Sequence, residues 1–251
     1  MKCRGLSLFL IKILSKNTPE ALAKISTLIA KYNVSILSSI INTLSDKSKA
    51  SIMSFLDFDK ALISVNELVK KLMELDEVLG VEVVKPQFPG LVVNDLLYPI
   101  SCLDFRCVLV HIDGIGKLLE FLYGKFGSAA KVLMYYAGYS STKGIIKGLK
   151  RITGLKGLPL LRACLQLFQA CGYGKFQVSY HKFMPASIVI KAFNLFECEP
   201  FKGKMREANS HIFRGVLACI IEEVTGKKAI VLEGKCIAKG DPYCQFIVKL
   251  Q

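Results

Sequence analysis

The sequence has no apolar run long enough to span a bilayer. No uncharged stretch, Ala163 to Gly174 included, reaches the about 20 residues that a membrane-spanning helix needs. The opening MKCRGLSLFLIKILSK resembles a signal peptide only briefly, because Lys12 interrupts the apolar part and no small-residue cleavage site follows. We therefore interpret this opening as a first β-strand and expect a cytoplasmic protein with no transmembrane segment.

A disulfide framework is also missing. The nine cysteines are an odd number, and their spacings follow no recognisable pattern. Without an export signal, most of them should be reduced, buried thiols that pack as small apolar side chains. A functional role for any cysteine must therefore come from its local context.

Acidic residues are scarce in one region of the chain. From Lys117 to Lys191 there are twelve basic residues and a single acid, Glu120, whereas residues 1–90 carry twelve basic and nine acidic residues. This basic stretch would attract anions, nucleic acid among them, although a solubilising lysine-rich surface is the simpler interpretation. Its basic residues are not grouped in a run with interleaved aromatics, and it has no zinc-finger or homeodomain pattern, so nucleic acid is only an alternative partner.

The sequence lacks recognisable catalytic motifs. No GxGxxG follows a predicted strand, so a dinucleotide site is not indicated. The three histidines, His111, His181 and His211, have no triad-like local context. We therefore expect a protein that is not an enzyme.

The N-terminal region alternates strands and helices in the order β-α-β-β-α-β. Leu6 to Leu14 predicts a buried strand, and Thr18 can cap a helix with Pro19 at its first position. The remaining elements are a hairpin formed by NVSILSSIINTL and KASIMSFLDFD, an amphipathic helix at Asn66 to Leu75, and a last strand, VLGVEVV. This order predicts a ferredoxin-like α+β domain, with one antiparallel sheet covered by two helices.

Several of these residues resemble an ACT domain, a regulatory module that binds amino acids or other small effectors in many family members. The matching features are Pro19 before Leu22 and Ile25, the segment YNVSI at Tyr32 to Ile36, and the ending LDEVLGVEVVKP. The resemblance covers roughly residues 5–86.

The resemblance places candidate effector-binding residues at Thr18, Glu20 and Asn33. However, the family usually has Gly where this chain has Glu20, and Gly allows a close approach of the backbone to the effector. A carboxylate there would crowd or repel an amino-acid ligand. The alternative is a domain that serves only dimerisation.

A proline-containing segment follows. Pro86, Pro89 and Pro99 fix extended backbone and remove hydrogen-bond donors, which is typical of a semi-rigid connector. We predict a first domain at residues 1–86, a linker at 87–100 and a second domain at 101–251.

The second region predicts a mixed α/β domain with an antiparallel sheet and several helices. Tyr135 and Tyr139 lie in one predicted helix, where they either pack in the core or line a ligand pocket. The predicted elements are a strand at Phe105 to Ile112, helices at Ile115 to Phe126, Ser128 to Arg151 and Leu158 to Cys171, strands at Phe176 to Lys182 and Ser187 to Phe196, the helix REANSHIFRGVLACIIEEVTG, and a hairpin of Lys228 to Ile237 with Tyr243 to Leu250.

The final hairpin contains two cysteines in the stretch EGKCIAKGDPYCQF. Cys236 and Cys244 are symmetric about Gly240, so a simple hairpin would place them side by side. Glu233 would point to the opposite face of a regular strand, but a bulge at Gly234 could bring it to the same side. A carboxylate and two thiolates could then share a metal, with zinc the most plausible.

The segment RGVLACIIEEVTGKKAIVLEGKCIAKGDPYCQF resembles the 4-vinyl-reductase domain family. That family includes hydrocarbon-binding proteins and aromatic-sensing modules of bacterial activators, and it shares its fold with subunits of the TRAPP vesicle-tethering complex. The resemblance covers roughly residues 100–250 and implies an apolar pocket beneath the sheet, commonly in a dimer. In sensor members a glutamate and two cysteines help bind zinc, which maps onto Glu233, Cys236 and Cys244.

The family's fourth zinc ligand is a cysteine, and the matching position here is Ser210, a poor ligand for zinc. His211 is turned about 100° away from Ser210 on a helical wheel, so it could complete the site only if the helix start is irregular. The expected metal site is therefore Glu233, Cys236, Cys244 and His211, with a structural zinc. A pair of reduced thiols is the alternative, and a disulfide is disfavoured in a reducing compartment.

Together these features predict a non-catalytic, small-molecule-sensing regulatory protein. We expect a homodimer that binds a hydrophobic small molecule or acyl chain in its second domain. The alternatives are a scaffolding role, a nucleic-acid-associated regulator that uses the basic surface, and a reductase-related enzyme, which the family name implies.

Overall fold

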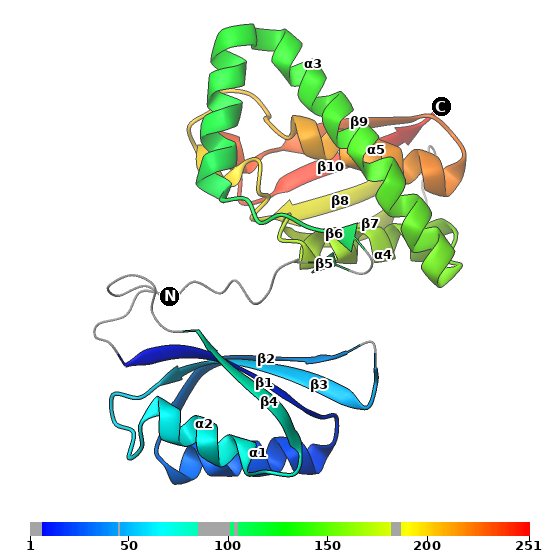
Figure 1. The fold of residues 1–251 in the computed structure, drawn as a ribbon. Helices are drawn as coiled ribbons and strands as arrows, with labels where there is room; N and C mark the ends of the chain where they lie inside the picture. Colours follow the sequence, from blue (N-terminus) through cyan, green and yellow to red (C-terminus); the bar gives the residue numbers. More distant parts are fainter. Residues whose placement is uncertain (1–6, 45, 85–100, 103–104, 182–186) are drawn as a thin grey trace. The chain divides into compact units, whose positions relative to one another are not determined.

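The chain forms two compact units, Met1–Ser101 and Cys102–Gln251. A computed structural model describes residues 7–44, 46–84, 101–102, 105–181 and 187–251, which Figure 1 draws in colour. The predicted linker at 87–100 lies outside these residues. No helix in the described part of the chain combines the length and the apolar character needed to cross a membrane.

The first unit has the predicted order β-α-β-β-α-β. Its elements are β1 (Leu8–Lys16), α1 (Pro19–Lys31), β2 (Ser35–Thr43), β3 (Lys49–Asp57), α2 (Val65–Met73) and β4 (Val78–Val84). The strands form one antiparallel sheet in the order β2-β3-β1-β4. Figure 1 shows α1 and α2 on the same face of this sheet, so the predicted ferredoxin-like arrangement is confirmed.

Local sequence determines where the two helices of this unit begin. The Thr18 hydroxyl accepts a hydrogen bond from the Ala21 amide, and Pro19 takes the first helical position of α1. Ser64 and Glu67 form a reciprocal capping box at the start of α2. The apolar sides of both helices then pack on the sheet through buried residues such as Ile11, Ile13, Ile25, Ile29, Leu56, Leu68 and Leu72.

The second unit begins with a short strand pair and two helices. The elements are β5 (Ser101–Cys102), β6 (Phe105–Arg106), α3 (Ile112–Thr153) and α4 (Gly157–Ala170). The strand predicted at Phe105 to Ile112 is therefore much shorter, because α3 already begins at Ile112. The two helices predicted within residues 115–151 are the two arms of α3. Gly127 separates these arms with a φ of 55°, a left-handed conformation that glycine adopts readily.

An antiparallel sheet completes the second unit in the order β7-β8-β10-β9. The elements are β7 (Lys175–His181), β8 (Ser187–Phe193), a 3-10 turn η1 (Glu199–Phe201), α5 (His211–Thr225), β9 (Ala229–Lys235), a second 3-10 turn η2 (Ile237–Lys239) and β10 (Cys244–Leu250). Helix α5 is buried along most of its length. Figure 1 shows it between the long α3 helix and the sheet.

Two glycines allow α3 and α5 to cross closely. A Cβ atom at Gly215 would collide with the Tyr135 carbonyl oxygen, and one at Gly138 would collide with the Ile212 carbonyl oxygen. Each contact joins a glycine on one helix to the backbone of the other. The crossing therefore has no room for a side chain at either position, and it fixes the start of α5 against α3.

Candidate metal centre and its surroundings

The β9–β10 hairpin brings Cys236 and Cys244 to the same end of the sheet. Lys235 pairs with Gln245, so the cysteines directly beyond this pair face each other across the turn. The turn contains η2 and ends at Gly240, whose φ is 99°. The Asp241 carboxylate accepts a hydrogen bond of 2.8 Å from the Cys236 amide, which fixes the two arms of the turn together.

A bulge brings Glu233 into the same group. The register of β9 against β10 shifts between Gln245 and Phe246, which pair with Lys235 and Glu233 respectively. Gly234 is the extra residue between them, as the sequence indicated. The Glu233 carboxylate consequently lies beside Cys236 and Cys244 instead of on the opposite face.

Cys198 supplies a third sulfur that the sequence analysis missed. It lies in the turn that follows β8, immediately before η1. β8 pairs with β10, with Ala192 opposite Cys244, so the chain that leaves β8 emerges beside the hairpin cysteines. The only local signal in the sequence was a cysteine between two glutamates, directly after the strand predicted at Ser187 to Phe196 and 38 positions from Cys236.

The four side chains form a compact group that could hold a metal ion. The ligand atoms of Cys198, Glu233, Cys236 and Cys244 all lie within 4.8 Å of one another. The three cysteines are fully buried and free of disulfide bonds. The Cys198 and Cys236 sulfur atoms are 3.7 Å apart, close to the about 3.8 Å between two thiolates on one tetrahedral zinc.

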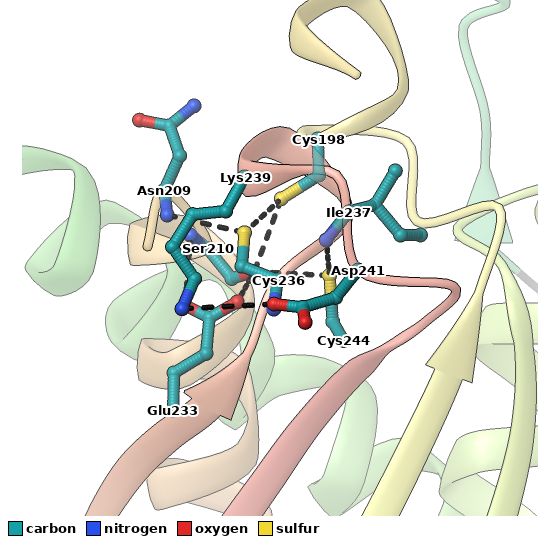
Figure 2. A network of polar contacts seen from close by, with 9 residues as sticks. All are labelled: Cys198, Asn209, Ser210, Glu233, Cys236, Ile237, Lys239, Asp241 and Cys244. Atoms are coloured by element: carbon teal, nitrogen blue, oxygen red, sulfur yellow. Dashed lines mark hydrogen bonds and ion pairs between the residues drawn. The ribbon is translucent and has the colours of Figure 1, made fainter. Parts of the chain in front are cut away.

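Backbone amides and Ser210 surround the cluster with hydrogen bonds (Figure 2). The Asn209 amide donates to the Cys236 sulfur at 3.4 Å, and the Ile237 amide donates to the Cys244 sulfur at 3.3 Å. The Ser210 hydroxyl donates to the Glu233 carboxylate at 2.6 Å. Such outer contacts orient the ligands of a metal site, so Ser210 supports the cluster without being one of its four members.

Within the cluster, the protein alone favours ionisation of one thiol, because only the pKa of Cys236 is lowered. Burial raises the pKa of Glu233 to about 8, and the neighbouring Cys236 thiolate adds to this shift. Hydrogen bonds from Cys198 and Cys244 lower the pKa of the Cys236 thiol, whereas hydrogen bonding to Cys236 raises the pKa of Cys198. The protein therefore stabilises one thiolate, and a divalent cation would balance the charge of additional ionised ligands.

His211 lies outside this group. It is the first residue of α5, and its Nδ1 atom is 2.8 Å from Nη2 of Arg214. Its ring is also in edge-to-face contact with Tyr123. The structure thus brings together Glu233, Cys236 and Cys244 with Cys198, while His211 contacts Arg214 and Tyr123.

The two candidate tyrosines of the second unit have different surroundings. The Tyr139 hydroxyl donates a hydrogen bond of 2.6 Å to Glu222, which raises the pKa of Tyr139 to about 12. Tyr135 lines a cavity of about 420 Å³ between α3 and the start of α5. Tyr139 therefore joins α3 to α5, while Tyr135 borders space that a ligand could occupy.

The candidate effector residues of the first unit have structural contacts. Thr18 caps α1, and Glu20 forms a 2.8 Å ion pair with Lys24. Asn33 follows the other end of α1 with a φ of 53°, and its amide nitrogen donates to the Lys60 carbonyl oxygen. Thr18 and Glu20 are thus separated from Asn33 by the length of α1, about 20 Å at 1.5 Å per residue.

The fold and the cluster define the second unit as an α+β unit with a buried centre of three cysteines and one glutamate. No protein-family model matches the chain, and no curated protein matches it significantly. Among solved structures, the chain is similar to the phenol-responsive sensory domain of the transcription activator PoxR with phenol. The identity is 18%, the match covers 58% of this chain and 77% of that one, and the TM-score is 0.51, which shows a shared fold.

Two further similarities involve the families that the sequence resembles. A vinyl-4-reductase family protein from Methanocaldococcus jannaschii is 18% identical over 58% of this chain and 84% of that one, with a TM-score of 0.43. The ACT domain of GTP pyrophosphokinase from Chlorobium tepidum is 19% identical over 31% of this chain and 97% of that one, with a TM-score of 0.27. Both TM-scores are low and both matches are partial, so no function is inferred from them.

Proposed function

We propose that the second unit is the ligand-binding part of a small-molecule-sensing regulatory protein. The observation that carries this proposal is the fold that the unit shares with a phenol-responsive sensory domain. A small, largely apolar compound is the ligand class that this likeness suggests. The proposed output is a change in the contacts of the unit with a partner chain, not a chemical reaction.

The proposal assigns a structural zinc ion to Cys198, Glu233, Cys236 and Cys244. Three thiolates and a carboxylate are a donor set that favours zinc over magnesium or calcium. Four protein ligands leave no open position on a tetrahedral ion, which is the property of a structural site. The ion would join two segments, the turn after β8 and the β9–β10 hairpin. The start of α5 would be held to it indirectly, because the Ser210 hydroxyl donates to the Glu233 carboxylate.

A homodimer is part of the same proposal. All nine residues of β2 are exposed, although Ile36, Leu37, Ile40 and Ile41 are apolar, and β2 is an edge strand of its sheet. An apolar edge strand is a template for pairing with a second chain. Nucleic-acid binding and a reductase activity remain alternatives from the sequence, and no contact within the described ranges favours either one.

Native mass spectrometry of untagged protein, purified without added metal and measured before and after denaturation, tests this proposal. We expect a dimer that loses one zinc ion and one apolar compound per chain on denaturation. Zinc without any compound, followed by no binding of aromatic or acyl probes, would contradict a sensing function. An acyl chain that is retained in every preparation would instead favour the scaffolding alternative.

A further inference from the structure

Three buried polar atoms around the start of α5, and one on Tyr123 of α3, whose ring contacts His211, have no hydrogen-bond partner among the residues that the structure describes. They are Tyr123 Oη, Asn209 Nδ2, His211 Nε2 and Arg214 Nε. Asn209 is only 2% exposed and His211 only 7%. Buried polar groups are almost always hydrogen-bonded in proteins, so a group of four without partners in one place indicates a missing ligand or ordered water.

All four of these atoms can act as donors. Arginine only donates, so the hydrogen bond between Arg214 Nη2 and His211 Nδ1 makes Nδ1 the acceptor and leaves the histidine proton on Nε2. The Asn209 amide nitrogen, the Arg214 Nε–H group and the Tyr123 hydroxyl are donors by their chemistry. Together they match a ligand atom that accepts several hydrogen bonds.

The residues that carry these buried atoms line two neighbouring cavities. His211 and Arg214 line the cavity of about 420 Å³ together with Lys131, Tyr135 and Tyr136. Asn209 and Tyr123 line a neighbouring cavity of about 310 Å³, which Lys131 also borders. Figure 2 shows the side-chain amide of Asn209 turned away from the three sulfur atoms, so this group does not serve the metal cluster.

The charges around these cavities favour an anion. Arg214 and Lys131 are positive, and Arg206 lines the smaller cavity. The opposing carboxylate, Glu207, pairs with Lys131 at 3.0 Å but is 78% exposed, so solvent screens it. The first amides of α5 are not available, because the Glu197 carboxylate accepts from Ile212 and Phe213.

The walls favour an apolar or aromatic body behind that anion. Tyr135 and Tyr136 form an edge-to-face pair with ring centroids 5.5 Å apart, and both border the larger cavity beside Val132. A cavity of this size is at the lower end of the range for small-molecule sites. It suits a single aromatic ring better than a long acyl chain.

We propose that the donors of Asn209, His211, Arg214 and Tyr123, with Lys131, form a site for a small aromatic carboxylate between α3 and the start of α5. The carboxylate lies among the donors, and the ring packs against Tyr135 and Tyr136. This inference rests on the proposed sensing function and names its ligand class. The site is linked to the metal cluster, because the backbone of Asn209 contacts Cys236 and Ser210 contacts Glu233.

Calorimetric titration of the full chain with benzoate, phenol and toluene tests this site in a carboxylate-free buffer. We expect benzoate to bind more tightly than toluene or phenol. Replacing Arg214 by glutamine should weaken benzoate binding at least about tenfold, the usual loss for a hydrogen bond to a charged group. Arg162→Gln is the matched control, because Arg162 is an exposed arginine on α4, and it should bind benzoate like the wild type.

Two substitutions at His211 keep the site testable even if the Arg214→Gln variant does not fold. His211→Gln retains a donor near the Nε2 position and should bind benzoate, whereas His211→Phe removes that donor and should not. Absence of benzoate binding to the wild type, or equal binding by all variants, would overturn the proposal. Tight binding of toluene or phenol that none of these substitutions changes would also overturn it, while leaving the sensing function intact.

Discussion

At the scale of single residues, Cys198 has the largest consequence for function. It turns a three-residue group that the sequence indicates into a four-residue centre with the number of ligands that zinc requires. The Ser210 hydroxyl, at the N-cap of α5, donates to the Glu233 carboxylate and is not itself a member of the group.

Loss of a residue that only hydrogen-bonds to a metal ligand typically weakens metal binding by about 10–100-fold. Replacing Cys198 by serine should weaken zinc binding by more than this. The physical reason is the loss of a thiolate ligand from a buried site. Competition with a zinc-chelating dye measures the affinity. Cys164→Ser is the matched control, because Cys164 is a buried cysteine in the core and lies outside the cluster. Equal zinc affinity in the two variants would show that Cys198 is not a ligand.

At the scale of elements, the crossing of α3 and α5 positions both candidate sites. Gly215 packs against the backbone of Tyr135, and Gly138 packs against the backbone of Ile212. These contacts bring Tyr135 and His211 to the same cavity and hold Ser210 at the edge of the cluster. A substitution at the crossing should therefore lower the free energy of unfolding of the second unit, and its effect should not be confined to one side chain of either candidate site.

Gly215→Ala should lower the free energy of unfolding by about 3 kcal/mol, at the upper end of the cost of overpacking, because backbone atoms cannot move aside as a side chain can. The corresponding glycine with open surroundings is Gly144 on α3. Gly144→Ala should leave stability unchanged or raise it by about 0.5–1 kcal/mol, since alanine favours the helix. Denaturant unfolding measures the free energy of unfolding of the Gly215→Ala and Gly144→Ala variants. A Gly215 variant as stable as the Gly144 variant would mean that the helices can separate at little cost.

At the scale of the whole molecule, local pattern predicted most of the architecture. The order of elements in the first unit, the Gly127 break and the β9–β10 hairpin all follow from short-range features such as caps, glycines and alternation. Glu233, Cys236 and Cys244 could be grouped for the same reason, since they are close in sequence and only one bulge had to be inferred.

The contributions that sequence analysis missed come from distant segments. Cys198 reaches the cluster because β8 pairs with β10, a pairing that no local pattern specifies. The donors of Tyr123 and Arg214 come together only through the packing of α3 on α5. The sequence offered His211 as the fourth ligand only if the helix start is irregular, whereas the structure groups Cys198 with the other three side chains and brings His211 Nδ1 within 2.8 Å of Arg214.

We propose that a metal ion at Cys198, Glu233, Cys236 and Cys244 organises the second unit for ligand binding. Hydrogen exchange of the full chain, measured with and without a zinc chelator, tests this role of the ion. Chelation should remove protection from the start of α5 and the β9–β10 hairpin, together with the turn after β8, while β1 to β4 of the first unit stay protected as an internal control. If protein that first contains zinc keeps the same protection in those three segments after all of its zinc is removed, the proposed role of the ion is wrong.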